Sequence, residues 1–181
     1  SILSFVDHNK FRITNCLLLP FSVVFFILSQ LRVWFYKVGI LKVSQAEVPV
    51  IVVGNITIGG SGKTPIVITL CRYFESHNKS VGVVSRGYGG KYTQDTLKVT
   101  PLTDPKECGD EPALIAQQTN AQVVVAKRRS KAIKYLTSND QVDIIISDDG
   151  LQHYAMGRDL EIVVIDGIRR FGNGLLLPAG P

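Results

Sequence analysis

Cysteine is scarce in this chain of 181 residues. The three cysteines, Cys16, Cys71 and Cys108, are odd in number and include no C-x-x-C pair. This pattern argues against a disulfide framework and is typical of a reducing cytosol. Internal repeats and low-complexity segments are also absent from the sequence. With 45% hydrophobic residues, the chain is long enough to form one compact domain with a core.

Charge is absent between Ile13 and Leu31, although the whole chain carries a net charge of +5 that suggests an anionic partner. The length of the uncharged run alone would allow a membrane-spanning helix. Pro20 divides the run, however, and several polar residues dilute it. No small-residue cleavage site follows it, which argues against a secretory signal peptide.

A helix that begins at Pro20 would be amphipathic. Its apolar side would carry large side chains, and Trp34 and Tyr36 would suit the depth of the lipid headgroups. The polar side would hold Ser22, Ser29, Gln30, Arg32, Tyr36 and Lys37. We therefore predict that residues 1–47 form a membrane-anchor segment whose helix lies in the interface, and that residues 48–181 form the core. A single span and a helix packed on the protein's own core are the alternatives.

A glycine is missing where the phosphate-loop pattern G-x-x-x-x-G-K-[ST] would begin. The stretch TIGGSGKT starts with Thr57 instead. Gly59, Gly60 and Gly62 still allow the backbone to approach a phosphate group closely. The missing glycine therefore does not exclude a nucleotide site.

The segments around this loop favour a nucleotide site. The β-branched run Val48–Val53 predicts a buried strand before the loop, and Lys63–Ser76 predicts a helix after it. Backbone N–H groups and the helix dipole would form an anion site, in which Lys63 reaches the β- and γ-phosphates and the Thr64 hydroxyl binds Mg²⁺. We predict that ATP contacts Thr57, Gly59, Gly60, Ser61, Gly62, Lys63 and Thr64.

Beyond residue 47, apolar runs alternate with helical patterns. This alternation predicts an α/β fold like that of P-loop NTPases, with a parallel sheet and flanking helices on both faces. The predicted strands are Val48–Val53, Val81–Ser85, Gln122–Ala126, Asp143–Ser147 and Leu160–Ile165, with a short one at Leu97–Val99. The predicted helices are Lys63–Ser76, Glu111–Thr119 and Arg128–Thr137.

Acidic residues follow two of the predicted strands. Asp148 and Asp149 follow Asp143–Ser147, and Asp166 follows Leu160–Ile165. Functional groups gather at the carboxyl ends of parallel strands, where a carboxylate can hold Mg²⁺. The paired acids favour Asp148 as the metal ligand with Asp149 beside it. The pattern alone does not decide which of the two strands carries the metal ligand. A carboxylate that caps a turn is the structural alternative.

Three polar loops complete the candidate site. The GDEP motif at residues 109–112 is most simply a helix start with Asp110 as its N-cap. The SRGYGG loop after the second strand offers Arg86 and Tyr88. The cluster at residues 127–129 offers cations to an anionic substrate, although such a cluster is usually a solvated helix start.

Several motifs together resemble one family. They are VGNITIGGSGKTP, SRGYGG, GDEP, SDDGLQH, RDLEIVVIDG and NGLLLPAGP. In this order, and over essentially the whole chain, they resemble the tetraacyldisaccharide 4′-kinases, the lipid A kinases of Gram-negative bacteria. The loop of that family is similar to T-x-G-G-x-G-K-T, which fits Thr57. Members continue into a second lobe, so the resemblance implies that this chain is an N-terminal fragment.

The resemblance implies a lipid kinase that uses ATP and Mg²⁺. Such kinases transfer the γ-phosphate to the 4′-hydroxyl of an acylated glucosamine disaccharide 1-phosphate, at the cytoplasmic face of the bacterial inner membrane. By similarity Asp110 is the base that accepts the hydroxyl proton, with Lys63 and Asp149 as the other catalytic residues. The candidate substrate-binding residues are Arg86, Tyr88, Arg128, Arg129 and His153. The predicted partners are this lipid and the membrane surface, and not nucleic acid.

Two other classes of protein are alternatives. A membrane-tethered ATPase switch of the partitioning type normally carries a lysine just before the paired glycines, where this chain has Ile58. A soluble coenzyme or nucleoside kinase is disfavoured by the interfacial helix. Hydrolysis of ATP on liposomes without a sugar acceptor would favour the switch.

Overall fold

The computed structural model describes residues 13–41, 43, 45–55 and 62–165. The chain divides into two compact units, each considered by itself below. One unit comprises Val43–Gly54 and Gly62–Val163. The other comprises Ser1–Lys42, Asn55–Ser61 and Val164–Pro181, and its described part is mainly helix α1 (Ile13–Lys37).

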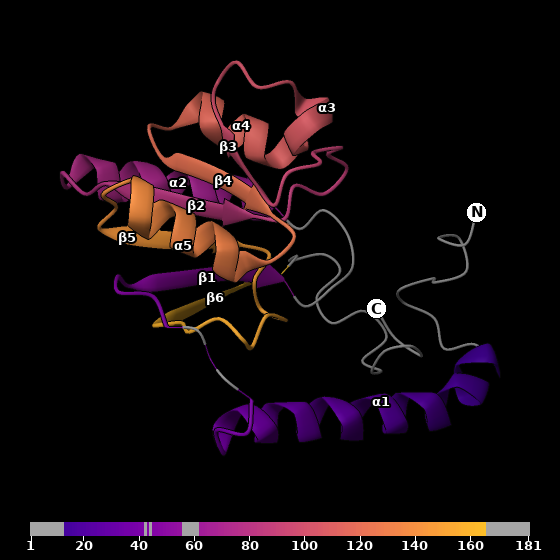
Figure 1. The fold of residues 1–181 in the computed structure, drawn as a ribbon. Coiled ribbons are helices and arrows are strands. Elements are labelled where there is room, and N and C mark those ends of the chain that lie inside the picture. Colours follow the sequence, from indigo (N-terminus) through magenta and orange to yellow (C-terminus); the bar gives the residue numbers. More distant parts are fainter. Residues whose placement is uncertain (1–12, 42, 44, 56–61, 166–181) are drawn as a thin grey trace. The chain divides into compact units, whose positions relative to one another are not determined.

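A six-stranded sheet with the strand order β3-β4-β2-β5-β1-β6 forms the centre of the larger unit (Figure 1). The strands are β1 (Val50–Asn55), β2 (Val81–Ser85), β3 (Thr96–Val99), β4 (Gln122–Ala126), β5 (Ile144–Asp148) and β6 (Leu160–Val164). The pairs β1–β5, β5–β2 and β2–β4 are parallel, whereas the edge strand β3 runs antiparallel to β4. The predicted α/β fold with a mainly parallel sheet is confirmed.

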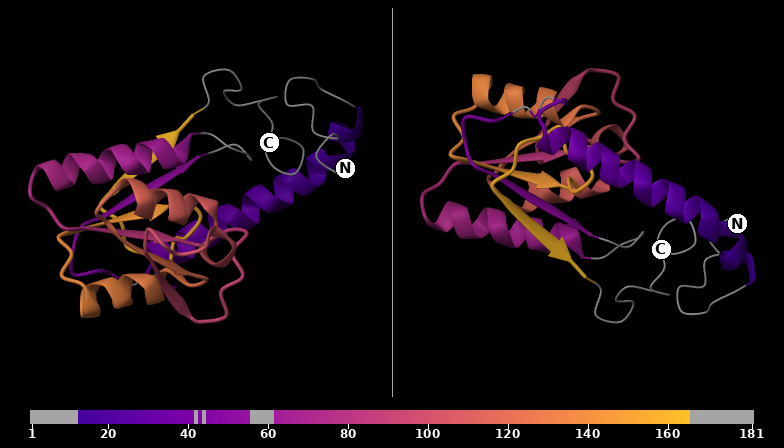
Figure 2. Two further views of the ribbon diagram at one scale, coloured as in Figure 1. Left: turned by 90° about the horizontal axis from the view of Figure 1, so that it is seen from above. Right: turned by 90° about the horizontal axis from the view of Figure 1, so that it is seen from below.

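Helices cover both faces of this sheet. They are α2 (Lys63–Ser76), α4 (Asp110–Gln118) and α5 (Arg129–Asn139), with the short α3 (Pro105–Cys108) before α4. Figure 2 shows α2 and α5 on opposite sides of the strands, and α4 packs against α2 and β4. Each of these three longer helices begins within one residue of the predicted position.

The alternation of side chains along each strand explains this layering. Val52, Val84 and Val124 are buried in one cluster with Ala132 and Leu136 of α5. The intervening residues of the strands face α2 and α4, because successive side chains of a strand point to opposite faces. Burying each such valine or leucine contributes about 1.5–3 kcal/mol to folding. The apolar runs therefore hold the strands rigidly, and the carboxyl ends of β1, β2, β4 and β5 meet at one edge.

The position of Asp148 in the sheet differs from the prediction by one residue. Strand β5 begins at Ile144 and includes Asp148, which lies opposite Val53 of β1 in the register. Asp143 precedes the strand, and its carboxylate accepts a hydrogen bond from the backbone N–H of Ser80, at 2.8 Å. The acid at the strand end is therefore part of the sheet and not of the loop after it.

The smaller unit corrects one prediction about the N-terminal segment. Helix α1 begins at Ile13 and continues through Pro20, so Pro20 does not begin the helix. An internal proline removes one backbone hydrogen bond at a cost of about 3 kcal/mol, which the remaining turns of this 25-residue helix tolerate. The side chains of Phe25, Leu28 and Trp34 are exposed, whereas Ser22 is buried. None of the described helices meets the length and hydropathy needed to cross a bilayer.

Candidate functional site

Lys63 lies at the first position of α2, next to a glycine with an unusual backbone conformation. Gly62, the N-cap of α2, has a φ of +74°, which favours glycine because other side chains rarely adopt it. The Nζ atom of Lys63 lies 2.7 Å from Oδ1 of Asp149. This ion pair joins the start of α2 to the acidic turn that follows β5.

Part of the predicted nucleotide loop lies outside the described residues. This applies to Thr57, Gly59, Gly60 and Ser61, and also to Asp166 at the end of the last predicted strand. Thr64 lies in the first turn of α2 and is half-buried. The geometry of the site therefore rests on the start of α2 and on the strand ends beside it.

Asp148 is a buried carboxylate at the end of β5, with only 1% of its surface exposed. Its Oδ2 accepts a hydrogen bond from Oγ of Ser85, at 3.3 Å. Its Oδ1 is buried and has no hydrogen-bond partner in the described part of the chain. Burial raises the pKa of Asp148 from 3.8 to about 6, and the charge of Glu111 acts in the same direction, whereas Lys63 lowers it.

The next residue, Asp149, points its carboxylate elsewhere. Its φ of +54° is an uncommon left-handed conformation for a residue with a side chain, although aspartate tolerates it better than most. Gly150 then passes close to the sheet, since a Cβ at that position would lie 2.6 Å from Oγ of Ser147. The turn thus separates two consecutive carboxylates: Asp148 is buried, and Asp149 is exposed beside Lys63.

Arg129, at the start of α5, lies beneath this turn with only 4% of its surface exposed. Its Nη2 atom donates hydrogen bonds to the backbone carbonyl oxygens of Asp148, at 3.0 Å, and of Asp149, at 3.3 Å. Burial lowers the pKa of the guanidinium, and the charges of the two aspartates oppose that shift. Arg129 was predicted to bind substrate, but its described contacts are with the main chain of the acidic turn.

The SRGYGG loop after β2 packs tightly against the loop between α3 and α4. A Cβ at Gly90 would lie 2.4 Å from the carbonyl oxygen of Glu107, and a Cβ at Gly109 would lie 2.6 Å from that of Tyr88. Gly109 also has a φ of +93°, so both space and conformation require glycine there. This close contact brings the loop that carries Arg86 and Tyr88 against the start of α4.

The structure corrects the simplest prediction for Asp110. The N-cap of α4 is Gly109, no side chain caps this helix, and Asp110 is the first helical residue. Gly109 takes the cap position because its positive φ produces the sharp turn between α3 and α4. Asp110 is exposed in the first turn, where the helix dipole favours a negative charge. Its side chain accepts no hydrogen bond from the described residues.

The other predicted substrate residues come from different loops. Arg86, Tyr88 and Arg128 are exposed, and Tyr88 is 89% exposed. The hydroxyl group of Tyr92 donates a hydrogen bond to the carbonyl oxygen of Arg86, at 2.8 Å, which holds this part of the SRGYGG loop. His153 lies in the turns after β5 and is half-buried.

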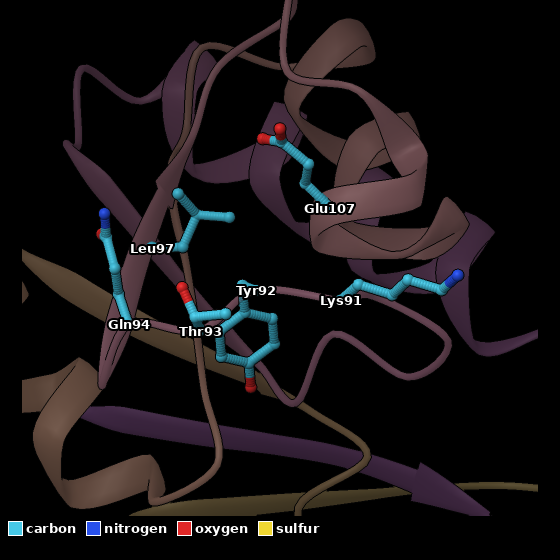
Figure 3. Close-up of a pocket in the computed structure, with 6 residues that line it drawn as sticks. All are labelled: Lys91, Tyr92, Thr93, Gln94, Leu97 and Glu107. Carbon is cyan, nitrogen blue, oxygen red and sulfur yellow. The ribbon is translucent and has the colours of Figure 1, made fainter.

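A small pocket of about 190 Å³ lies beside the SRGYGG loop. It is lined by Lys91, Tyr92, Thr93, Gln94, Leu97 and Glu107 (Figure 3). The Glu107 carboxylate faces Leu97 across the pocket, while the Lys91 side chain extends away from Leu97 (Figure 3). The pocket is too small for a whole nucleotide.

Two residues of the site were not predicted. Ser85 is buried and hydrogen-bonded to Asp148, and Glu111 is close enough to raise the pKa of Asp148. Ser85 could have been found from its place as the last residue of a predicted strand, since parallel strands align their carboxyl ends. Glu111 lies next to Asp110, and only the packing of α4 brings it toward β5.

Known proteins resemble this chain along nearly its whole length. A family model described as tetraacyldisaccharide-1-P 4′-kinase, LpxK, matches residues 14–181. The tetraacyldisaccharide 4′-kinase of Ruthia magnifica is 58% identical over 176 residues, which cover 97% of this chain and 56% of that protein. The enzyme of the same name from Mannheimia succiniciproducens is 51% identical over 165 residues, covering 91% of this chain and 51% of that protein.

A solved structure supports the same relationship. It is described as the apo form of LpxK from Aquifex aeolicus in complex with ATP, and it matches with a TM-score of 0.80 and 35% sequence identity. The match covers 93% of this chain and 53% of that one. The chain therefore spans about half the length of the relatives that it matches. On the family model and these matches, the chain belongs to the tetraacyldisaccharide-1-P 4′-kinase family.

Proposed function

We propose that this protein transfers the γ-phosphate of ATP to the 4′-hydroxyl of a tetraacyl glucosamine disaccharide 1-phosphate. The observation that carries the proposal is the contact of 2.7 Å between Lys63 and Asp149. It brings the lysine of the phosphate-loop pattern together with the acidic turn at the carboxyl end of β5. Phosphoryl transfer depends mainly on such positioned charges and needs little covalent chemistry from the protein.

Lys63 and the start of α2 bind the β- and γ-phosphates in this proposal. Lys63 has only 12% of its side chain exposed, so its charge is held in one place, whereas Asp149 is 63% exposed. An ion pair with one exposed partner contributes little to stability. In this proposal the ion pair positions Lys63, because Asp149 directs the ammonium group toward the edge of the sheet. Phosphate oxygens then replace or share that contact.

The residues present fit a magnesium ion at Asp148. The buried Oδ1 of Asp148 has a free acceptor position, and the Thr64 hydroxyl lies at the start of α2. The described residues include no cluster of three acidic, histidine or cysteine side chains arranged for a metal. Proteins usually hold Mg²⁺ through one or two carboxylates with phosphates and water, and Asp148 can supply one such carboxylate. When bound, the ion would supply positive charge to the phosphate oxygens.

Asp110 acts as the general base for the sugar hydroxyl in this proposal. Because Gly109 is the helix cap, no capping hydrogen bond occupies the Asp110 carboxylate. Asp110 is exposed at the start of α4, beside the loop that carries Tyr88. An exposed carboxylate at this place can be reached by an incoming hydroxyl group and can accept its proton.

The acceptor lipid binds at exposed groups and at the membrane surface. Arg86 and Arg128 offer positive charge for a phosphate, the half-buried His153 offers a hydrogen bond, and Tyr88 offers an aromatic face. The exposed apolar side chains of α1 hold the protein at the cytoplasmic face of the inner membrane, where the acyl chains reside. A helix that lies in the membrane interface can anchor a protein without crossing the bilayer.

Phosphate transfer from labelled ATP tests the proposal. The full-length protein is mixed with the tetraacyldisaccharide 1-phosphate in detergent micelles, and the labelled lipid is separated from ATP and inorganic phosphate. We expect labelled lipid with the wild type and a loss of about 10²-fold or more with Lys63→Ala. Release of inorganic phosphate on liposomes, without transfer to the lipid, would instead indicate an ATPase switch.

A further inference from the structure

Arg129 holds the two peptide groups on either side of the Asp149 Cα. One of these groups ends in the carbonyl of Asp148 and the other in the carbonyl of Asp149, and a single nitrogen, Nη2, donates to both. The φ and ψ angles of Asp149 lie between these two groups. A donor that bridges them restricts both angles, and the φ in question is the uncommon value of +54°.

The same side chain is shielded from any lipid headgroup. Arg129 is 4% exposed, and its Nε and Nη1 atoms are buried without hydrogen-bond partners in the described part of the chain. The preceding residue, Arg128, is exposed. Neighbouring arginines of one cluster thus face different surroundings, and only Arg128 is open to a phosphate from solution.

We propose that Arg129 is a positioning residue of the phosphoryl-transfer site, and not a substrate ligand. It holds the turn after β5 so that the Asp148 carboxylate stays buried at the strand end while the Asp149 carboxylate meets Lys63. Its charge also interacts favourably with both aspartates and so offsets their mutual repulsion. The inference rests on the proposed function only where it concerns turnover, since the geometry of the turn does not depend on the acceptor.

The charge arrangement around Arg129 agrees with this role. Asp148 and Asp149 both stabilise the guanidinium charge, whereas Arg86 destabilises it. Removing the guanidinium would leave two adjacent carboxylates without their buried counter-charge. The polyanionic phosphates of ATP would then meet a more negative site and a less ordered turn.

The test compares Arg129→Met and Arg129→Lys with the wild type in the full-length protein. Methionine retains much of the apolar stem but removes the donors and the charge. Lysine restores the charge, and one ammonium group can donate to both carbonyls, as Nη2 does. Lys134→Met is the matched control, because it removes a charge from the exposed face of the same helix.

Four quantities are measured for each variant. They are kcat, the KM for the acceptor with its 1-phosphate, the KM for an acceptor that lacks the 1-phosphate, and the Kd of a fluorescent ATP analogue in EDTA. Melting temperatures show which variants fold. We expect Arg129→Met to lower kcat by about 10–10²-fold with both acceptors, because small displacements of reacting groups have effects of that size. The KM for either acceptor stays within about threefold, the ATP analogue binds more weakly, and Arg129→Lys recovers part of kcat.

The opposite pattern would overturn the inference. If Arg129 binds the lipid, its replacement raises the KM only for the acceptor that carries the 1-phosphate and leaves kcat and ATP binding unchanged. If Arg129→Met does not fold, Arg129→Gln, which removes the charge but keeps a polar side chain, carries the same comparison: a lower kcat at unchanged acceptor KM supports the inference, and unchanged kcat refutes it. If the wild type transfers no phosphate to the lipid, the proposed function fails. The inference is then decided by whether Arg129→Met weakens binding of the ATP analogue relative to Lys134→Met.

Discussion

Replacing Asp148 by asparagine should stabilise the protein at neutral pH, in the absence of metal and nucleotide. Asp148 is almost fully buried, and burial raises its pKa from 3.8 to about 6. A shift of about two units corresponds to roughly 3 kcal/mol of destabilisation when the carboxylate is ionised, at about 1.4 kcal/mol per unit. Asparagine keeps an acceptor for Ser85 but buries an amide, which offsets about 1 kcal/mol of the gain.

The destabilisation depends on pH in a defined direction. Below about pH 4 the carboxyl group is protonated in both the folded and unfolded states, so it contributes no penalty. Between about pH 4 and pH 6 the folded state retains the proton that the unfolded state has lost, and the free energy of unfolding falls as the pH rises. Above about pH 6 the full penalty applies. Asp148→Asn removes this dependence.

Chemical denaturation of the full-length protein in EDTA provides the assay. From about pH 5 to pH 8, the wild type should lose roughly 1–1.5 kcal/mol more stability than Asp148→Asn. Asp149→Asn is the matched control, because that neighbouring carboxylate is exposed and solvated by water in both states. An equal stability difference between wild type and Asp148→Asn at both pH values would refute the argument from burial.

Three further predictions concern the site and the N-terminal helix. Lys63→Ala should lower turnover by about 10²-fold or more, because it removes the charge directed at the transferring phosphoryl group, and turnover within about threefold of wild type would contradict this role. Asp110→Asn should lower kcat by about 10²–10⁴-fold with an unchanged melting temperature, because Gly109 and not Asp110 caps α4; normal turnover would exclude Asp110 as the base. Deletion of residues 1–38 should leave a folded core that no longer sediments with liposomes in high salt, and unchanged sedimentation would place the membrane contact elsewhere.

Local sequence patterns determined most of the strands and helices. Val81–Ser85 and Gln122–Ala126 have the predicted boundaries because each is a short, largely β-branched run that the fold buries. Helix α2 (Lys63–Ser76) also has its predicted boundaries, because a glycine with positive φ precedes it and the helix carries an apolar face. In contrast, Pro20 was a misleading signal, because α1 begins at Ile13 and tolerates one missing hydrogen bond.

The roles of neighbouring polar residues were decided only by the tertiary structure. The sequence predicted paired acids at a strand end, but it could not show that Asp148 is buried and Asp149 exposed, because the left-handed turn and the packing of Gly150 separate them. Nor could it distinguish Arg128 from Arg129, since burial at the start of α5 depends on how that helix packs against β4 and β2. Motifs therefore determined which chemical groups are present, whereas packing between segments distant in the chain determined which of those groups face one another.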